Sequence, residues 1–323
     1  YTLEEKLGEV GMGVVYRARH AMLHRPTAVK FLDTAKANEK AIARFEREVQ
    51  LTSQLNHPNT IAIYDYGRTE EGVFYYAMEL LDGINLQDLV DKYGPQPEGR
   101  VIRILTQICG SLAEAHTIGL IHRDVKPANI LLNERGGLFD VVKLLDFGLV
   151  KMAEGEREGL VTRMGGVVGT PLYMSPEAYQ SPNSVDSRTD IYAVGAVGYF
   201  LLTGTPLFFG ESVLDILKQQ VSSIPDPPSL RGGLPISPEL ERLLMRCLEK
   251  APDKRPASAL EIISALNALP TASSWTDQDA AGWWQRYRPG QLASSKPATA
   301  IPTEIVETVV LQSPMEVSPG GES

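Results

Sequence analysis

The chain has 323 residues, of which 43% are hydrophobic, so it is long enough for one large two-lobed domain or two small ones. That apolar content argues against wholesale disorder. Lys and Arg total 31 against 40 Asp and Glu, and the net charge of −9 disfavours nonspecific binding to nucleic acid or to an anionic membrane. The two cysteines, Cys109 and Cys247, supply neither a metal-type cluster nor a disulfide framework, which fits a reducing compartment.

Strand patterns dominate the first part of the chain. A glycine-bearing turn is expected at 8–13, and a helix over 37–55 because apolar residues recur on one face with charges opposite. His57-Pro58-Asn59 ends that helix. Alternation of apolar and polar residues predicts strands over 1–7, 14–19, 27–32, 60–66 and 73–80.

Helical patterns dominate after Asp82. The segment 190–203 is apolar on all sides, as expected of a helix enclosed by others. Glycines and Pro206 interrupt the longer apolar stretch 191–209, so it is predicted to be a buried helix and a loop rather than a membrane span. Periodicity predicts helices over 101–115, 190–203, 212–221, 238–248 and 258–269.

The composition changes after Leu269, where Ser, Thr, Pro, Ala and Gly become frequent and most of the chain is expected to lie outside the fold. The segment 275–287 is the exception, because it holds all three tryptophans. Thr276 and the residues after it are suited to cap a short helix. We expect this helix to dock on the rest of the protein as a packing element, with a partner-binding site as the alternative.

Two motifs carry the chemistry of the chain. Residues 121–129 have the sequence IHRDVKPAN, and Asp146-Phe147-Gly148 follows after an apolar run. Together they offer a carboxylate to orient a hydroxyl, cations to offset phosphate charge, and oxygen ligands for magnesium. Either motif alone could occur by chance in a polar loop, whereas the two in this order point to phosphoryl transfer from ATP.

The order and spacing of these motifs resemble those of protein kinases, and the chain resembles the eukaryotic-like Ser/Thr kinases of bacteria over about 1–269. The resemblance implies an α+β, two-lobed protein-kinase fold. The small lobe, 1–81, would hold a five-stranded sheet, one main helix and the hinge, and the large lobe, 82–269, would be mainly helical. Residues 270–323 would form a Ser/Thr/Pro/Ala-rich tail that contains the short tryptophan helix.

The resemblance also implies the catalytic roles. Asp124 would be the catalytic base and Lys126 a cation for the transferred phosphate. Asn129 and Asp146 would bind magnesium. Lys30 would hold the α- and β-phosphates of ATP and would pair with a helical glutamate, for which Glu48 is favoured because its neighbours fall on other helix faces.

The glycine loop departs from the family pattern at one position, because Val10 replaces the middle glycine. A β-branched residue there stiffens a loop whose backbone must approach phosphates, so ATP binding is expected to be weakened rather than lost. The resemblance places the nucleotide among Gly8, Val10, Gly11, Gly13, Val15, Ala28, Met78, the hinge residues Glu79 to Leu81, and Leu131.

Residues 146–177 match the activation and peptide-docking segment of Ser/Thr kinases. Arg123, next to the base, is typical of kinases that are switched by a phosphate on this segment. Only Thr162 and Thr170 carry a hydroxyl group between Asp146 and Pro171, and Thr162 is the favoured acceptor. In the family, the glutamate at that end pairs with a distant arginine, here Glu177 with Arg255, and Asp190 braces the catalytic loop.

The predicted function is transfer of the ATP γ-phosphate to Ser or Thr hydroxyls of proteins, including the chain itself, with ATP and Mg²⁺ as cofactors. A binding-only pseudokinase is the alternative, and Val10 is its sequence argument. A kinase of small molecules is disfavoured by the docking segment 169–177. Protein substrates and self-association are the expected partners, with no nucleic acid and no membrane segment in this chain.

The chain lacks an initiator methionine and opens within a strand pattern, so it is expected to be part of a longer protein. A cytoplasmic catalytic region is predicted, with any membrane anchor lying outside this chain. In the tail, Thr303 and Thr308 each precede an aliphatic residue by three positions, and would suit a phosphothreonine-reading domain if phosphorylated. A passive linker is the favoured interpretation.

Overall fold

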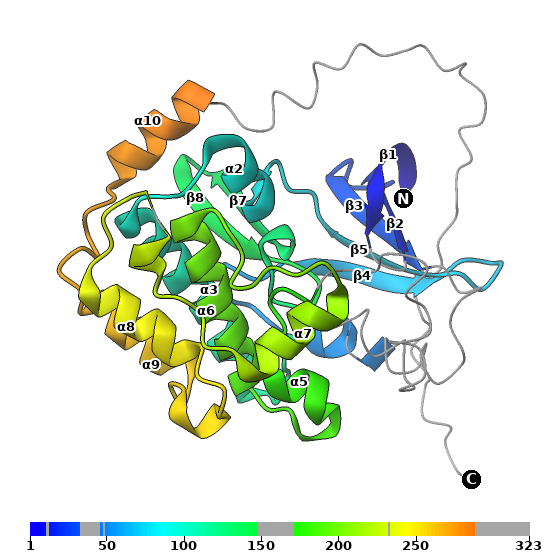
Figure 1. Ribbon diagram of the computed structural model, residues 1–323. Coiled ribbons are helices and arrows are strands. Elements are labelled where there is room, and N and C mark those ends of the chain that lie inside the picture. Colours follow the sequence, from blue (N-terminus) through cyan, green and yellow to red (C-terminus); the bar gives the residue numbers. More distant parts are fainter. Residues whose placement is uncertain (11–12, 33–45, 48, 148–170, 232, 288–323) are drawn as a thin grey trace, which may run out of the picture.

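The N-terminal part of the protein forms an antiparallel sheet with the strand order β1-β2-β3-β5-β4 (Figure 1). Both faces of this sheet carry buried side chains. On β5, Phe74 and Tyr76 pack with Val49 on one face, and Tyr75 and Ala77 pack on the other. The alternation of side chains along a strand explains this division. The strands are β1 (Thr2–Val10), β2 (Gly13–Arg19), β3 (Pro26–Leu32), β4 (Ile63–Arg68) and β5 (Phe74–Glu79).

The structure is a computed structural model that describes residues 1–10, 13–32, 46–47, 49–147, 171–231 and 233–287. Of the helix expected over 37–55, the described part is helical at 46–47 and 49–52. The strand expected from Thr60 begins later, at Ile63. The reason is that Thr60 forms a parallel bridge to Leu144, and Ile61 N–H donates to the Leu144 carbonyl at 3.0 Å, so this segment is held by the second lobe instead.

A second sheet consists of three antiparallel strands, none of which was predicted from the sequence. Its strands are β6 (Gly83–Asn85), β7 (Ile130–Arg135) and β8 (Leu138–Leu144). β6 has only three residues, and the adjacent apolar residues of β7 and β8 do not by themselves distinguish a strand from a buried helix segment. The sheet matters for the site because β7 follows the first chemical motif directly and β8 leads into the second.

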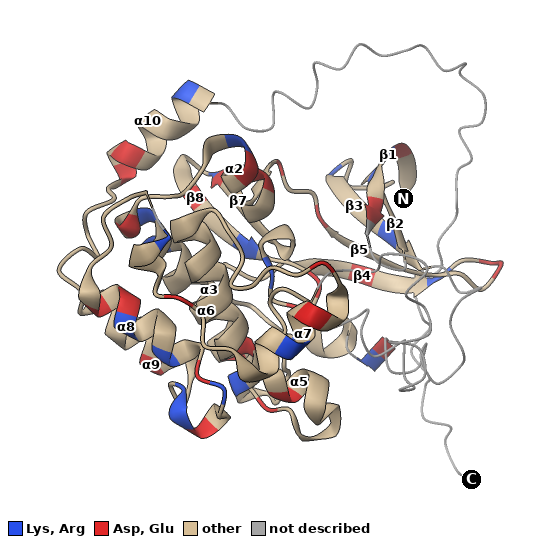
Figure 2. Ribbon diagram, in the orientation of Figure 1, with Lys and Arg blue, Asp and Glu red and all other residues tan. Residues whose placement is uncertain are grey.

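Helices make up most of the large lobe, with α3 and α6 at its centre (Figure 1). Nearly every residue of α6 is buried, as the all-round apolar sequence predicted. The bounds are α2 (Leu86–Tyr93), α3 (Glu98–Thr117), α5 (Pro176–Gln180), α6 (Arg188–Thr203), α7 (Val213–Ser222), α8 (Pro238–Cys247), α9 (Ala259–Asn267) and α10 (Asp277–Tyr287). Figure 2 shows acidic and basic residues interspersed on the outer helices, α8 among them.

The last described helix, α10, docks on the large lobe through a buried carboxylate. Trp275 and Trp284 donate their indole N–H groups to the two oxygens of Asp140 at 2.9 and 2.8 Å. Arg100 binds the same carboxylate in a bidentate manner and lies 4.0 Å from the ring centroid of Trp283. Both members of this ion pair are fully buried, so the tryptophans complete the shell of polar partners that a buried charge requires.

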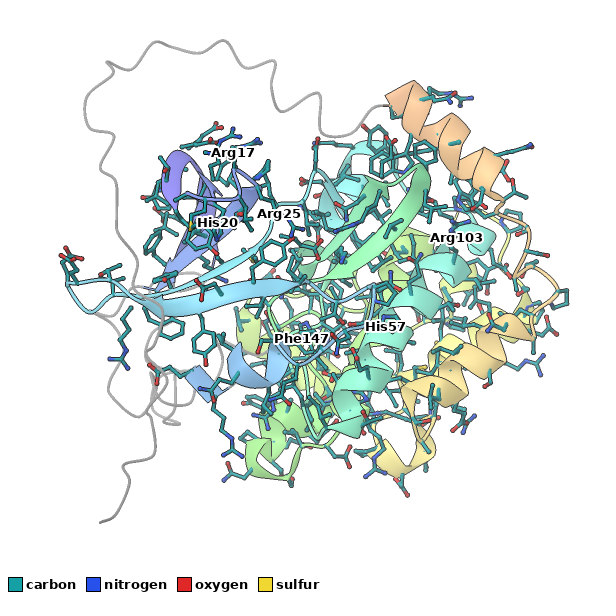
Figure 3. The ribbon with its side chains drawn as sticks, turned by 180° about the vertical axis from the view of Figure 1, so that it is seen from behind. Arg17, His20, Arg25, His57, Arg103 and Phe147 are labelled. Atoms are coloured by element: carbon teal, nitrogen blue, oxygen red, sulfur yellow. The ribbon has the colours of Figure 1, made fainter. Side chains whose placement is uncertain are left out.

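Two further contacts fix the start of α10. Thr276 and Asp279 exchange hydrogen bonds in a capping box, because Asp279 N–H donates to the Thr276 hydroxyl and Thr276 N–H donates to the Asp279 carboxylate. Arg103 of α3 pairs with Asp277 at 2.7 Å, and Figure 3 marks Arg103 at the end of the large lobe that carries α10. The tryptophan segment is therefore a docked helix.

Replacing Trp284 by Phe tests this docking. The change keeps an aromatic ring but removes one donor from a buried carboxylate, so the free energy of unfolding should fall by about 1–3 kcal/mol. Urea unfolding followed by far-ultraviolet circular dichroism measures it. The exposed Gln278 on the same helix is the control, and Gln278→Ala should change stability by less than about 0.5 kcal/mol. Equal stability of both variants would contradict the assigned role of the indole.

Candidate active site

The loop between α3 and β7 brings the predicted catalytic residue Lys126 and the predicted metal ligand Asn129 to the carboxylate of Asp124. Lys126 Nζ donates to Asp124 Oδ2 at 2.7 Å. Asn129 Nδ2 donates to the same oxygen and to the Asp124 backbone carbonyl, both at 2.9 Å. A short 3-10 turn over Pro127–Asn129 brings Asn129 back towards Asp124. Lys126 and Asn129, which follow Asp124 by two and five positions in the sequence, thus form one cluster with it.

Asp190, at the start of α6, binds the backbone of this loop through its carboxylate. Its carboxylate accepts the backbone N–H groups of His122 and Arg123, each at 2.8 Å, and lies 2.9 Å from His116 Nε2. Arg123 adopts a positive φ of 62°, which a non-glycine residue rarely does without such constraint. The bracing role expected of Asp190 is thus present as direct hydrogen bonds to the loop backbone.

His122 joins the two chemical motifs. Its Nδ1 accepts the N–H of Asp124 at 3.2 Å, and its Nε2 lies 2.9 Å from the carbonyl of Leu145, next to Asp146. These contacts fit a neutral ring that carries its proton on Nε2. Burial lowers the pKa of His122, which favours the neutral form. Phe147 is fully buried against this ring, with centroids 4.6 Å apart, at the centre of the molecule in Figure 3.

Asp146 makes the contact between the lobes. Lys30 of β3 donates to its Oδ2 at 2.8 Å, and the Tyr76 hydroxyl of β5 donates to Oδ1 at 2.9 Å. Burial opposes the charged form of Asp146, but the Lys30 cation and these hydrogen bonds outweigh it and lower the pKa of the carboxyl. Asp146 is therefore an anion held between two small-lobe strands, at a positive φ of 48°. Sequence reasoning missed Tyr76, which no motif marked.

Lys30 is 1% exposed and needs a charged partner. The structure supplies Asp146 as that partner, whereas the expected partner Glu48 lies outside the described residues. Gly13, opposite Leu32 in the β2–β3 ladder, allows the close approach of the strands around Lys30. A Cβ at Gly13 would meet the Phe31 carbonyl oxygen at 2.5 Å, so this loop glycine is required by the packing of the sheet.

The donor set fits a magnesium ion. Asn129 uses its amide nitrogen on Asp124, which turns its amide oxygen away from that residue. The Asp146 carboxylate comes from the neighbouring segment, since Leu145 N–H donates to the Asn129 carbonyl at 2.9 Å. Amide and carboxylate oxygens are the hard ligands that Mg²⁺ accepts from proteins. The chemistry of these two side chains therefore suits the metal predicted from sequence.

The residues expected around a nucleotide base come from adjacent strands of the small lobe and from one strand of the second sheet. Val15 is opposite Lys30 in the β2–β3 ladder, and Ala28 is opposite Met78 in the β3–β5 ladder. Leu131 lies on β7 of the large lobe. In the glycine loop, Gly8 is paired with Val15, and Val10 ends β1 opposite Gly13. Gly11 lies outside the described residues.

Glu79, expected in the hinge, has a buried side chain committed to the protein. Lys143 of β8 donates to its Oε1 at 2.6 Å, the Ala62 N–H donates to the same oxygen at 2.9 Å, and Arg135 pairs with the other oxygen. Burial disfavours the charged form, but these donors outweigh it and lower the pKa of Glu79. The side chain of Glu79 is thus bound within the protein, and its backbone N–H donates to the Ala62 carbonyl at 3.0 Å.

The docking end of the segment is anchored by a buried ion pair. Arg255 binds Glu177 with two hydrogen bonds of 2.7 and 2.8 Å, and Thr189 donates to the same carboxylate at 2.9 Å. This is the pair that the resemblance implied. Thr162 and Thr170 fall outside the described residues, so their proposed regulatory role rests on sequence.

The Glu177–Arg255 pair predicts a pH dependence of stability. Burial acts to raise the pKa of Glu177, but the Arg255 hydrogen bond and charge outweigh it and lower that pKa. The stabilisation is fully present above the unfolded-state value of roughly 4.3, and is lost as the pH falls through the lower folded-state pKa. Glu177→Gln should cost about 3 kcal/mol at pH 7, and the gap from the parent should shrink on acidification to pH 3.

Urea unfolding at pH 7, 5, 4 and 3 measures this gap. The control is Glu239→Gln, which breaks an exposed pair with Arg242 and should have little effect at any pH. A gap between Glu177→Gln and the parent that stays constant from pH 7 to 3 would show that the charge of Glu177 is not what stabilises the anchor.

Comparison with known proteins agrees with this geometry. A family model described as the protein kinase domain matches residues 1–266. Ser/Thr-protein kinase pkn3 of Myxococcus xanthus is 42% identical over 272 residues, which cover 83% of this chain and 50% of that protein. Ser/Thr-protein kinase PknB of Mycolicibacterium smegmatis is 40% identical over 266 residues, covering 81% of this chain and 41% of that protein.

Solved structures of a protein kinase domain also match this chain. The crystal structure of the PknI kinase domain of Mycobacterium tuberculosis matches with a TM-score of 0.62 and 29% identity, over 83% of this chain and 94% of that one. The chain spans half or less of the length of the two curated relatives, so the match concerns one part of those proteins.

Proposed function

Because the chain belongs to the protein kinase family, we propose that it transfers the γ-phosphate of ATP to Ser or Thr hydroxyls of proteins, itself included. The observation that carries the proposal is the cluster of Asp124, Lys126 and Asn129, which His122 joins to Asp146. This arrangement supplies a base, a cation and two oxygen ligands within one small region. Phosphoryl transfer needs little more than such positioned charges.

In this proposal each side chain has one role. Asp124 orients the attacking hydroxyl and accepts its proton, and Lys126 presents a positive charge to the transferred phosphoryl group. Lys30 contacts the α- and β-phosphates from the small lobe. Asn129 and Asp146 bind Mg²⁺, whose charge offsets that of the phosphates.

The partners follow from this chemistry. The substrates are proteins with an accessible Ser or Thr, and two copies of the chain meet during autophosphorylation. The catalytic region acts in the cytoplasm, where ATP is available. Among the described residues, no helix combines the length and the apolar character that a membrane span requires.

The base is tested by Asp124→Asn, which keeps the shape of the side chain and removes its charge. The rate of phosphate transfer from labelled ATP to a protein substrate should fall by about 10²–10⁴-fold, with the Michaelis constant for ATP little changed. Asp91→Asn, at an exposed position of α2, is the matched control and should retain full activity. Full activity of Asp124→Asn would remove Asp124 from the mechanism.

Autophosphorylation is tested by mapping label on this chain, on Asp146→Ala and on Val10→Gly. We expect label on Thr162, because a phosphate there gives Arg123 an anionic partner, and its loss in Asp146→Ala. Val10→Gly should lower the Michaelis constant for ATP by restoring flexibility to the loop. Label in Val10→Gly but not in the parent would mean that Val10 disables the site, and label in neither would favour a binding-only pseudokinase.

A further inference from the structure

A buried glutamine holds the backbone at the start of the docking segment. Gln220 lies near the end of α7 and is 1% exposed. Its Nε2 donates to the Leu172 carbonyl at 2.7 Å and lies 3.4 Å from the Pro171 carbonyl. Its Oε1 accepts the hydroxyl of Tyr192 from α6. Both ends of this amide are therefore used, and its donor end serves a segment 48 residues away in sequence.

Lys250 fixes the backbone of the same glutamine. Its Nζ donates to the Gln220 carbonyl at 2.8 Å, in the last turn of α7, where carbonyls lack a partner within the helix. A cation at this end of a helix is also favoured by the helix dipole. The Lys250 ammonium lies 4.9 Å from the ring centroid of Phe208 and 5.6 Å from that of Tyr192. Gln220 is thus held at its side chain and at its backbone.

The docking segment is consequently held at several points of its described part, and Ser175 adds a hydroxyl contact to Thr189 at 3.2 Å. Gln220 binds the backbone at Pro171–Leu172, and Arg255 binds the side chain of Glu177. These two contacts are linked, because the guanidinium of Arg255 lies 5.0 Å from the ring centroid of Tyr192, the residue that donates to Gln220. A carbonyl held by a buried donor cannot shift without leaving that donor unsatisfied, so Gln220 restricts the path of the chain at Leu172.

We propose that Gln220 is a positioning residue for protein substrates, which fixes the backbone of the docking segment against which the substrate chain lies. The inference rests on the proposed function. It concerns substrate binding and not the chemistry, because Gln220 touches none of Asp124, Asn129 or Asp146 through the contacts described above. Removing its amide should therefore weaken the binding of the protein substrate and leave ATP binding unchanged.

The test is steady-state kinetics of the full chain with dephosphorylated casein as the protein substrate. Gln220→Leu keeps the volume of the side chain and removes the amide. We expect the Michaelis constant for casein to rise about tenfold, the effect of one buried hydrogen bond, with less than a twofold change in the Michaelis constant for ATP. Tyr192→Phe, which removes only the hydroxyl that orients the amide, should give a smaller rise of the same kind.

Gln219→Leu is the matched control, since this neighbouring amide on α7 donates to the Phe209 carbonyl instead, and it should leave both constants unchanged. Equal rises for casein and ATP in Gln220→Leu would mean a structural role only, and no rise in either would overturn the inference. Hydrogen exchange of residues 171–177 gives an independent readout. If the parent transfers no phosphate, the proposed function fails, whereas unchanged exchange in Gln220→Leu refutes the positioning contact itself.

Discussion

The carboxylate of Asp190 is the constraint on which the candidate site depends. It lies on the most buried helix of the large lobe and accepts two consecutive backbone N–H groups of the catalytic loop. Arg123, which donates one of these bonds, has a positive φ, and the next residue, Asp124, contacts Lys126 and Asn129. A rigid apolar helix therefore positions a polar loop, and the strain in that loop is maintained by a charge that has no access to water.

The two lobes meet through polar contacts whose partners come from distant parts of the chain. Lys30 and Tyr76 reach Asp146 from the small lobe, and Lys143 reaches Glu79 at the hinge from β8. Each pair is at least partly buried, so breaking one leaves a charge or donor in a poorly solvated place. These contacts connect the two lobes around Asp146 and Glu79, and Leu55, which precedes β4, adds an apolar contact to the core of the large lobe.

The predicted two-lobed kinase fold is confirmed, and the long helices matched their periodic patterns closely. Periodicity found α8 because it has one buried face, and the continuous apolar sequence of α6 predicted a helix that is enclosed on all sides. Periodicity missed β6, which has only three residues, and β7 and β8, in which apolar residues stand next to one another instead of alternating with polar ones. The motifs located Asp124 and Asp146, but Tyr76, His122 as a link and Gln220 emerged only from tertiary contacts. A hydrogen bond across 70 residues, such as that of Tyr76, leaves no periodic trace in sequence.

The docking of α10 has a consequence for spectroscopy. All three tryptophans of the chain lie in the segment 275–287, and each contacts the buried pair of Arg100 and Asp140 or an aromatic neighbour of it. Intrinsic tryptophan emission therefore reports on a single place in the molecule. A red shift of the emission maximum that precedes the loss of helical circular dichroism would indicate that this one helix has detached. The candidate active site contains no tryptophan, so changes there would not contribute to the emission.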